Sequence, residues 1–238
     1  MSKLIKFQLR NVFKQKSFYI CMILTLLMIT VFTFPNSLTA KDKSAYMFMP
    51  QLIAFLKSEP AMFTAIFISL FVCFDFSEGT VKNIIGRGYT KNEYFISKLI
   101  SSVISVIIMF IIISVVIFAL YIKNGIGYDG NYIYDIFGRI FLLVAAITLY
   151  STFAFIFEKS GIAIIINLFV PVFIPLLFAL IDSKLKTNIS SIWIDSILNP
   201  LSKNPNFINV LESLGLTIVY IAVFYIVGSL LIKKKEIK

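Results

Sequence analysis

The sequence predicts an all-α integral membrane protein with six transmembrane helices. Two observations come from composition: 59% of the 238 residues are hydrophobic and only 14% are charged, whereas soluble domains have about 45–50% apolar and about 25% charged residues. The third observation is that the apolar residues gather in six runs, each close to the ~20 residues that a spanning helix needs. These observations exclude a soluble globular chain and a disordered chain.

Each apolar run is expected to form one span. The expected spans cover residues 17–34, 60–76, 99–122, 137–157, 162–181 and 214–232. Pro35 and Asn36 are expected to end the first span, and Pro60 is suited to the first turn of the second. Only residues 158–161 join the fourth and fifth spans, which predicts a tight helical hairpin. Because no repeat or linker divides the chain, residues 1–238 are expected to form one membrane domain.

The basic residues predict the orientation of these spans. With the N-terminus inside, fourteen of the 22 Lys and Arg residues lie on cytoplasmic segments and eight lie outside. Basic residues are enriched in cytoplasmic loops, so both termini are expected in the cytoplasm. A cleaved signal peptide is the alternative for the first span, because residues 38–40 loosely resemble a cleavage site. Cleavage would leave the other five spans oriented the same way.

Composition also limits the chemistry of this chain. It contains no histidine, which excludes histidine metal ligands and histidine general bases. Cys21 and Cys73 lie within apolar runs and are interpreted as buried apolar residues. No Gly-Lys pair occurs, so the chain lacks a phosphate-binding P-loop. We therefore expect no catalytic residue, no metal site and no ATPase activity on this chain, and the net charge of +10 is interpreted as a topology signal rather than as a sign of nucleic-acid binding.

The N-terminal residues 3–16 have the pattern of an amphipathic helix that lies in the membrane interface. Its basic face is expected to contain Lys3, Lys6, Arg10 and Lys14. Its apolar face is expected to contain Ile5, Leu9, Val12 and Phe13. Two interpretations stay open, namely a helix that couples a cytoplasmic partner to the spans and an anchor on anionic lipid.

The inner loop of residues 77–98 contains signals for two helices. Ser77 is expected to cap a short helix that Gly86 and Gly88 end. Thr90 and Glu93 then form the capping-box pattern that begins a new helix, which runs into the third span. From these signals alone, a docking element and a simple connection between two spans are both compatible with the loop.

The same region resembles the cytoplasmic coupling loop of ABC exporter permeases of the second type (ABC-2). The matching residues are Asp75, Glu78, Gly79, Thr80, Lys82, Asn83, Gly86, Gly88, Lys91, Ser97 and Lys98. At position 91 the family often has arginine, and lysine is expected to serve as the same surface cation. The family also has six spans, cytoplasmic termini, an amphipathic N-terminal helix and short extracellular helices between spans five and six, for which residues 182–213 are long enough. The small size of the chain and this loop are similar to those of bacterial permeases for lantibiotics and other peptide antibiotics.

The resemblance implies a permease subunit in the cell membrane of a bacterium. It implies a second permease copy, identical or related, and a separate ATP-binding subunit that carries ATP and magnesium. The loop residues would then have mechanical roles, and Lys6, Arg10 and Lys14 would belong to the interface helix. The implied activity is export of a hydrophobic or amphipathic substrate, with an antimicrobial peptide as the expected example.

The fifth span contains three residues that are unusual in a membrane helix. Asn167, Pro171 and Pro175 follow one another at four-residue spacing, so they share one face. Proline kinks a helix, and polar groups within the membrane usually face a cavity or another helix. The three residues are interpreted either as the wall of a substrate pathway or as ordinary helix packing.

Two other function classes compete with a permease. An ATP-independent carrier or channel is the alternative, although a proton- or ion-coupled carrier should place Asp, Glu or His deep in a span, and here Asp75 and Arg139 lie near span ends. An intramembrane protease would need histidine or paired carboxylates, which the chain lacks.

Overall fold

The computed structural model describes residues 1–39, 58–123, 133–187, 190, 193 and 207–234. Eight α-helices form nearly all of this part of the chain, and these described residues contain no strand. The helices are α1 (Ser2–Lys14), α2 (Lys16–Thr39), α4 (Ser58–Ser77), α5 (Thr80–Gly86), α6 (Lys91–Lys123), α7 (Ile133–Phe157), α8 (Ser160–Leu185) and α10 (Phe207–Lys234). The predicted all-helical class is confirmed.

Several of these helices are long and apolar enough to cross a membrane. Among the residues searched, four such stretches are Lys91–Ile113, Ile140–Phe157, Ser160–Leu185 and Leu214–Lys234. A fifth candidate is the pair Met62–Ser77 and Thr80–Gly86, which is bent by 64° at the break between the two helices. The chain therefore has the character of a multi-pass membrane protein.

Proline lies in the interior of two of the long helices. The prediction that the first helix ends before Pro35 is wrong, because α2 continues to Thr39. Pro171 and Pro175 also lie inside α8. In apolar surroundings an interrupted helix leaves more backbone groups without a hydrogen bond than the single one that proline removes, so the helix tolerates the proline.

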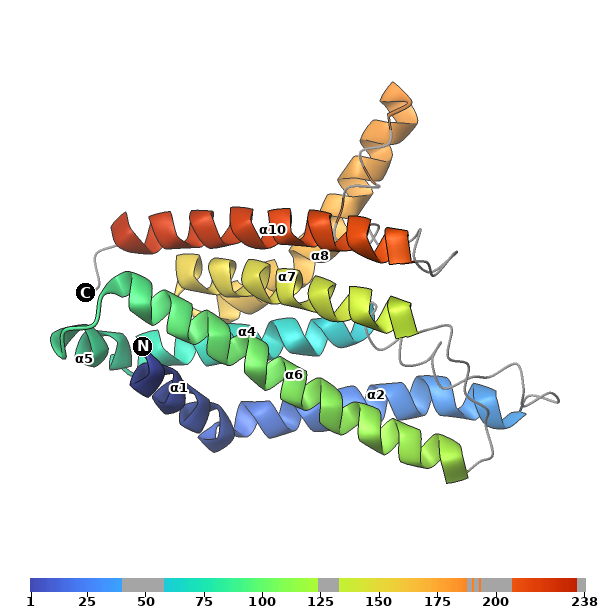
Figure 1. Ribbon diagram of the computed structural model, residues 1–238, viewed down its shortest axis with the longest axis horizontal. Coiled ribbons are helices and arrows are strands. Elements are labelled where there is room, and N and C mark those ends of the chain that lie inside the picture. Colours follow the sequence, from blue (N-terminus) through green and yellow to red (C-terminus); the bar gives the residue numbers. More distant parts are fainter. Residues whose placement is uncertain (40–57, 124–132, 188–189, 191–192, 194–206, 235–238) are drawn as a thin grey trace.

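The long helices form a bundle in which helices that follow one another along the chain run in opposite directions, whereas α7 and α10 lie side by side and run parallel. Figure 1 shows α1, α5, the turn between α7 and α8, and the C-terminal end of α10 at the same end of this bundle. We call this the α5 end. The predicted hairpin of the fourth and fifth spans is confirmed as the α7–α8 pair, which turns through Glu158 in a left-handed conformation with φ +56°.

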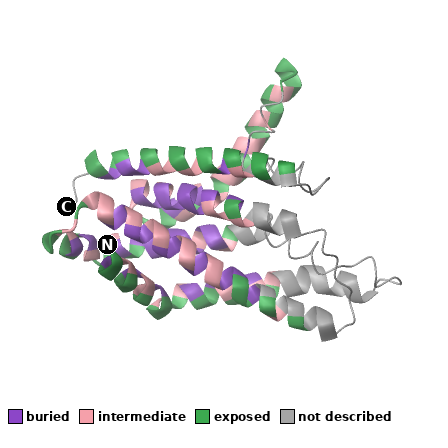
Figure 2. Cartoon of the chain, viewed as in Figure 1, coloured by how far each residue is buried: buried purple, intermediate pink, exposed green. Residues whose placement is uncertain are grey.

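The core of the bundle lies on α4, α6 and α7, and the outer helices α8 and α10 are more exposed (Figure 2). On α4, Phe67, Ile68 and Phe71 have no exposed surface. On α8, by contrast, Leu180 exposes 60% of its surface, and α10 exposes a similar apolar face. Lipid tails are as apolar as leucine, so a membrane helix has no need to bury such residues in protein.

Gly228 of α10 packs directly against the Phe95 ring of α6. A Cβ atom at this position would lie 2.5 Å from Cζ of Phe95 and 3.1 Å from Oγ1 of Thr152. The Phe95 ring is fully buried and has an edge contact with Phe155, with ring centroids 4.9 Å apart, so it has no free space to move into. Close packing of these two helices therefore requires glycine at position 228.

We expect Gly228→Ala to lower the free energy of unfolding by about 1–2 kcal/mol, because the overpacking cost exceeds the gain in helix propensity. Gly215→Ala is the matched control, since it lies on the same helix with nothing within 4 Å of the added Cβ. Thermal unfolding of the purified chain in detergent, followed by circular dichroism, measures both variants. Equal unfolding midpoints for the two variants would contradict the packing argument.

Candidate functional site

A buried ion pair joins the end of α4 to the beginning of α6. The Lys98 ammonium lies 2.8 Å from Oδ2 of Asp75, and the exposed fractions of the two side chains are 0% and 1%. Asp75 and Lys98 flank the loop that the sequence analysis singled out. The structure therefore brings the two outermost residues of the predicted coupling motif into direct contact.

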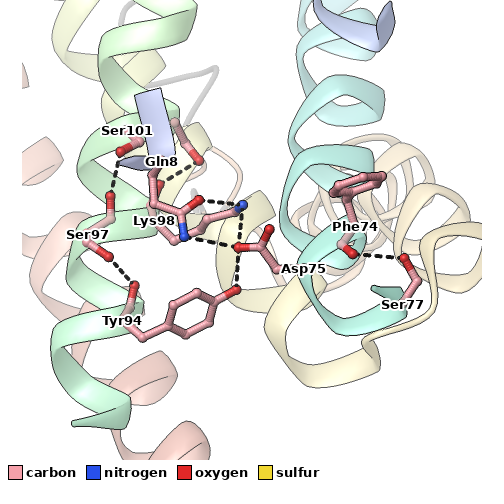
Figure 3. Close-up of polar contacts among 9 residues, drawn as sticks. Gln8, Phe74, Asp75, Ser77, Tyr94, Ser97, Lys98 and Ser101 are labelled. Atoms are coloured by element: carbon pink, nitrogen blue, oxygen red, sulfur yellow. Dashed lines mark hydrogen bonds and ion pairs between the residues drawn. The ribbon is translucent and has the colours of Figure 1, made fainter. Parts of the chain in front are cut away.

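Gln8 and Tyr94 form hydrogen bonds with this pair (Figure 3), and the Phe71 ring lies against it. Gln8 on α1 donates from Nε2 to Oδ2 of Asp75 at 3.1 Å, and its Oε1 accepts from Lys98 at 3.0 Å. The Tyr94 hydroxyl donates to the same Oδ2 at 3.0 Å. The Lys98 ammonium also lies 3.5 Å from the centre of the Phe71 ring. We call Gln8, Asp75, Tyr94 and Lys98 the polar cluster.

The electrostatics of the polar cluster restrict the relative positions of α1, α4 and α6. Removing two charges from water is costly, and only close pairing with further hydrogen bonds offsets that cost. Here three donors converge on one oxygen of Asp75, while Oδ1 has no hydrogen-bond partner. A shift of α4 or α6 would separate the two charges in an apolar environment, and a shift of α1 would break the hydrogen bonds of Gln8 to both of them.

Helical spacing explains how the sequence builds this cluster. Phe71 and Asp75 are four residues apart on α4, and Tyr94 and Lys98 are four residues apart on α6, so each pair shares a face. Gln8 lies on the buried face of α1. Ring contacts with Phe155 of α7 then extend the packing from Tyr94, at a centroid distance of 5.8 Å.

The buried face of α1 differs from the predicted one. The structure buries Leu4, Gln8 and Val12, whereas Phe13 exposes 42% of its surface. Gln8 is polar and is therefore not included in the predicted apolar face. Its four-residue spacing from Leu4 and Val12 nevertheless indicates that the three residues share one face of the helix. Lys6, Arg10 and Lys14 of the predicted basic face are all exposed.

The loop between α4 and α6 contains two left-handed glycines and one capping box. Gly79, with φ +65°, is the N-cap of α5, and Gly88, with φ +90°, follows the end of that helix. The prediction that Ser77 caps α5 is wrong, because its hydroxyl donates to the Phe74 carbonyl at 2.9 Å and so belongs to the end of α4. Because Ser77 bonds to α4, Gly79 is the N-cap of α5. The left-handed conformation of Gly79 bends the chain at this point.

The predicted capping box at the start of α6 is confirmed. The Thr90 N–H donates to the Glu93 carboxylate at 2.8 Å, and the Glu93 N–H donates to the Thr90 hydroxyl at 3.2 Å. The two residues thus satisfy each other's backbone donors at the point where α6 begins.

The predicted loop residues divide into a buried group and a surface group. Asp75, Ser97 and Lys98 are the buried group. The exposed residues are Glu78, Lys82, Asn83, Gly86 and Gly88, and the half-buried residues are Gly79, Thr80 and Lys91. Lys91 donates from its ammonium to the Lys233 carbonyl at 3.5 Å, which connects the loop to the end of α10. The surface group therefore lies at the α5 end, and the buried Asp75–Lys98 ion pair lies beneath it.

A cleft of about 590 Å³ separates α1 from α5. Lys3 and Phe7 line it from α1, and Asn83 and Arg87 line it from the loop. The exposed parts of both predicted cytoplasmic elements thus border one basic cleft. Neither Asp75 nor Lys98 lines this cleft.

The three unusual residues of the fifth span are not brought to a common site. Asn167 is 1% exposed and donates from Nδ2 to the Ser69 hydroxyl at 2.8 Å and to the Tyr150 carbonyl at 3.0 Å. These bonds join α8 to α4 and α7, which favours the packing interpretation for Asn167. Pro171 and Pro175 are half-buried farther along α8.

No group of three or more His, Cys, Asp or Glu side chains gathers into a possible metal site within the described ranges. Comparison with known proteins finds no family model that matches the chain and no curated protein that matches it. The resemblance to the permease family therefore depends on the loop residues themselves.

We expect Lys98→Met to destabilise the chain by about 3–5 kcal/mol, because it leaves the Asp75 carboxylate buried without a counter-charge. Adding Asp75→Asn should recover a large part of this loss, since the double variant buries no charge. Lys82→Met on α5 is the matched control, because Lys82 is exposed. Thermal unfolding in detergent compares the four proteins. If Lys98→Met costs no more than Lys82→Met, the ion pair does not hold the helices together.

Proposed function

We propose that this chain is the membrane-spanning subunit of an ATP-binding-cassette exporter of the second type, in the cell membrane of a bacterium. It has six spans with both termini in the cytoplasm, and it forms with a second permease copy the pathway for a hydrophobic or amphipathic substrate. The expected substrate is an antimicrobial peptide. A separate ATPase subunit supplies the energy and carries ATP and magnesium, and its docking surface is the α5 end.

The observation that carries the proposal is that the polar cluster holds the two ends of the loop together. Asp75 precedes α5 and Lys98 follows it, and their ion pair closes the loop at its base. Gln8 adds α1 to the same base. A displacement of α5 would be resisted by contacts to α1, α4 and α6 at once. Such a clamped, surface-exposed helix suits the transmission of force between a cytoplasmic motor and the membrane helices.

The α1–α5 cleft supports docking at this end. It lies between the two elements that the sequence analysis assigned to a cytoplasmic partner, and it carries Lys3 and Arg87. A partner segment with acidic and apolar side chains would complement this lining. The exposed residues Glu78, Lys82 and Asn83 would extend the contact along α5.

The arrangement of the helices is compatible with the proposed topology. The alternating helices bring the N-terminus, α5, the α7–α8 turn and the end of α10 to one end (Figure 1). In the proposal this end is cytoplasmic, in keeping with the excess of basic residues on these segments. The 24 residues of α2 are long enough to provide the first of six spans. The expected extracellular helices of residues 182–213 lie mostly outside the described residues.

The alternative function is an ATP-independent carrier or channel. The buried Asp75–Lys98 pair is the feature that favours it, because ionisable groups within membrane bundles often serve proton or ion coupling. The position of the pair at the base of the loop favours a mechanical role instead. The two functions differ in their need for an ATPase.

Affinity purification of the tagged chain from native membranes should recover an ATP-binding subunit in a stoichiometric complex. The reason is that the chain has no P-loop of its own. Mass spectrometry of the purified complex identifies the subunit. The control is another multi-pass protein with the same tag. Repeated purification without any ATP-binding subunit, accompanied by transport in vesicles that lack ATP, would support the carrier instead.

We expect Gly79→Ala to reduce the stimulation of ATPase activity that the reconstituted permease confers on its ATPase subunit. Alanine at φ +65° costs about 1–2 kcal/mol and would tilt α5 relative to α4. Gly86→Ala is the matched control, because both added Cβ atoms meet open space and only Gly79 has the left-handed backbone. The ATPase rates of the reconstituted complexes measure the effect. Equal stimulation by both variants would contradict the role of the loop in coupling.

A further inference from the structure

A second cleft lies at the α5 end, on the other side of α4 from the polar cluster. Its volume is about 770 Å³, and it is lined by the junction of α1 and α2, by the last turns of α4 and by the α7–α8 turn. We call it the lysine cleft, because Lys14, Lys16 and Lys159 line it. Neither the proposed coupling role nor the packing of the core uses these three residues together.

The rim of the lysine cleft is positively charged. Three lysines face one glutamate, Glu158, so the lining has a net charge of +2 at pH 7. Lys14, Lys16 and Lys159 are all exposed. Their ammonium groups are therefore accessible to a ligand while the cleft holds them near one another.

Two helix N-termini strengthen the positive potential of the rim. The first residues of α2 and of α8 both line the cleft. The first N–H groups of a helix have no partner within it and carry partial positive charge. Lys159, the N-cap of α8, makes no side-chain capping bond. Gln15, which also lines the cleft, has a side-chain amide whose buried oxygen and nitrogen lack hydrogen-bond partners.

The wall of the lysine cleft is apolar. Leu70, Cys73 and Phe74 line it from α4, at three- and four-residue spacing along one face of that helix. Ser77 is at the rim, so this strip leads from the rim into the apolar part of the bundle. A ligand that fills the cleft would place an anionic group among the lysines and an apolar group against α4.

We propose that the lysine cleft binds an anionic phospholipid. The phosphate lies among Lys14, Lys16 and Lys159, next to the N-terminus of α8, and one acyl chain follows the α4 strip. Basic pockets between membrane helices are suited to such headgroups. The apolar wall favours a phospholipid over a soluble phosphate, which would leave that wall without a partner.

Native mass spectrometry of the full chain in detergent tests this site, with phosphatidylglycerol and phosphatidylcholine of identical acyl chains as the probes. We expect the first phosphatidylglycerol to bind more tightly than phosphatidylcholine. Each lysine near a phosphate contributes about fivefold in affinity, so the triple variant K14Q/K16Q/K159Q should weaken phosphatidylglycerol binding by at least about tenfold. The control K184Q/K186Q/K234Q removes three exposed lysines outside the cleft and should leave the first binding event nearly unchanged.

Two further measurements distinguish a bound lipid from a bound soluble phosphate. Phe74→Gln should weaken the binding of both lipids, because it replaces part of the acyl-chain wall, while the preference for phosphatidylglycerol persists. Glycerol 3-phosphate in excess should not displace the bound lipid. Displacement by glycerol 3-phosphate would overturn the assignment of a lipid. Equal affinities of the triple variant and its control for phosphatidylglycerol would overturn the site. Thermal unfolding of each variant verifies that these surface changes leave the fold intact.

Discussion

The structure depends on the burial of one ion pair between Asp75 and Lys98. Charges removed from water are tolerated only when their partners are held at short distance, and here the partners come from three helices. The pair closes a loop of about twenty residues, and Gln8 joins the amphipathic N-terminal helix to the same point. Because an apolar membrane interior offers no replacement for a lost partner, the relative positions of α1, α4 and α6 follow from this contact.

The loop above this pair is built from elements that each restrict its conformation. Gly79 and Gly88 supply left-handed turns, and Thr90 with Glu93 begins α6 at a defined residue. Below the loop, Phe155 of α7 packs edge-on against Tyr94, with ring centroids 5.8 Å apart. A change in the position of α5 would therefore reach α4 and α6 through the ion pair and α7 through the aromatic rings.

Polar and apolar residues occupy different parts of the molecular surface. The outer faces of α8 and α10 expose apolar residues, whereas the α5 end carries exposed lysines and two basic clefts. Within the bundle, polar side chains such as Asn167 bond to neighbouring helices. The excess of basic residues thus has two consequences in our proposals, since it orients the spans and equips one end for an ATPase partner and for anionic lipid.

The sequence by itself determined the features that depend on neighbouring residues. The apolar runs predicted the helices, and the Thr90–Glu93 spacing predicted the start of α6, because hydrogen bonds between residues three or four apart are encoded in a short pattern. The tertiary structure alone decided which charged residues meet. Gln8 is separated by 67 positions from Asp75 and by 90 from Lys98, and no local pattern specifies such pairs. The local signals at Ser77 and Pro35 were misleading, because the Ser77 hydroxyl bonds back to Phe74 of α4 instead of capping α5, and α2 continues through Pro35 to Thr39.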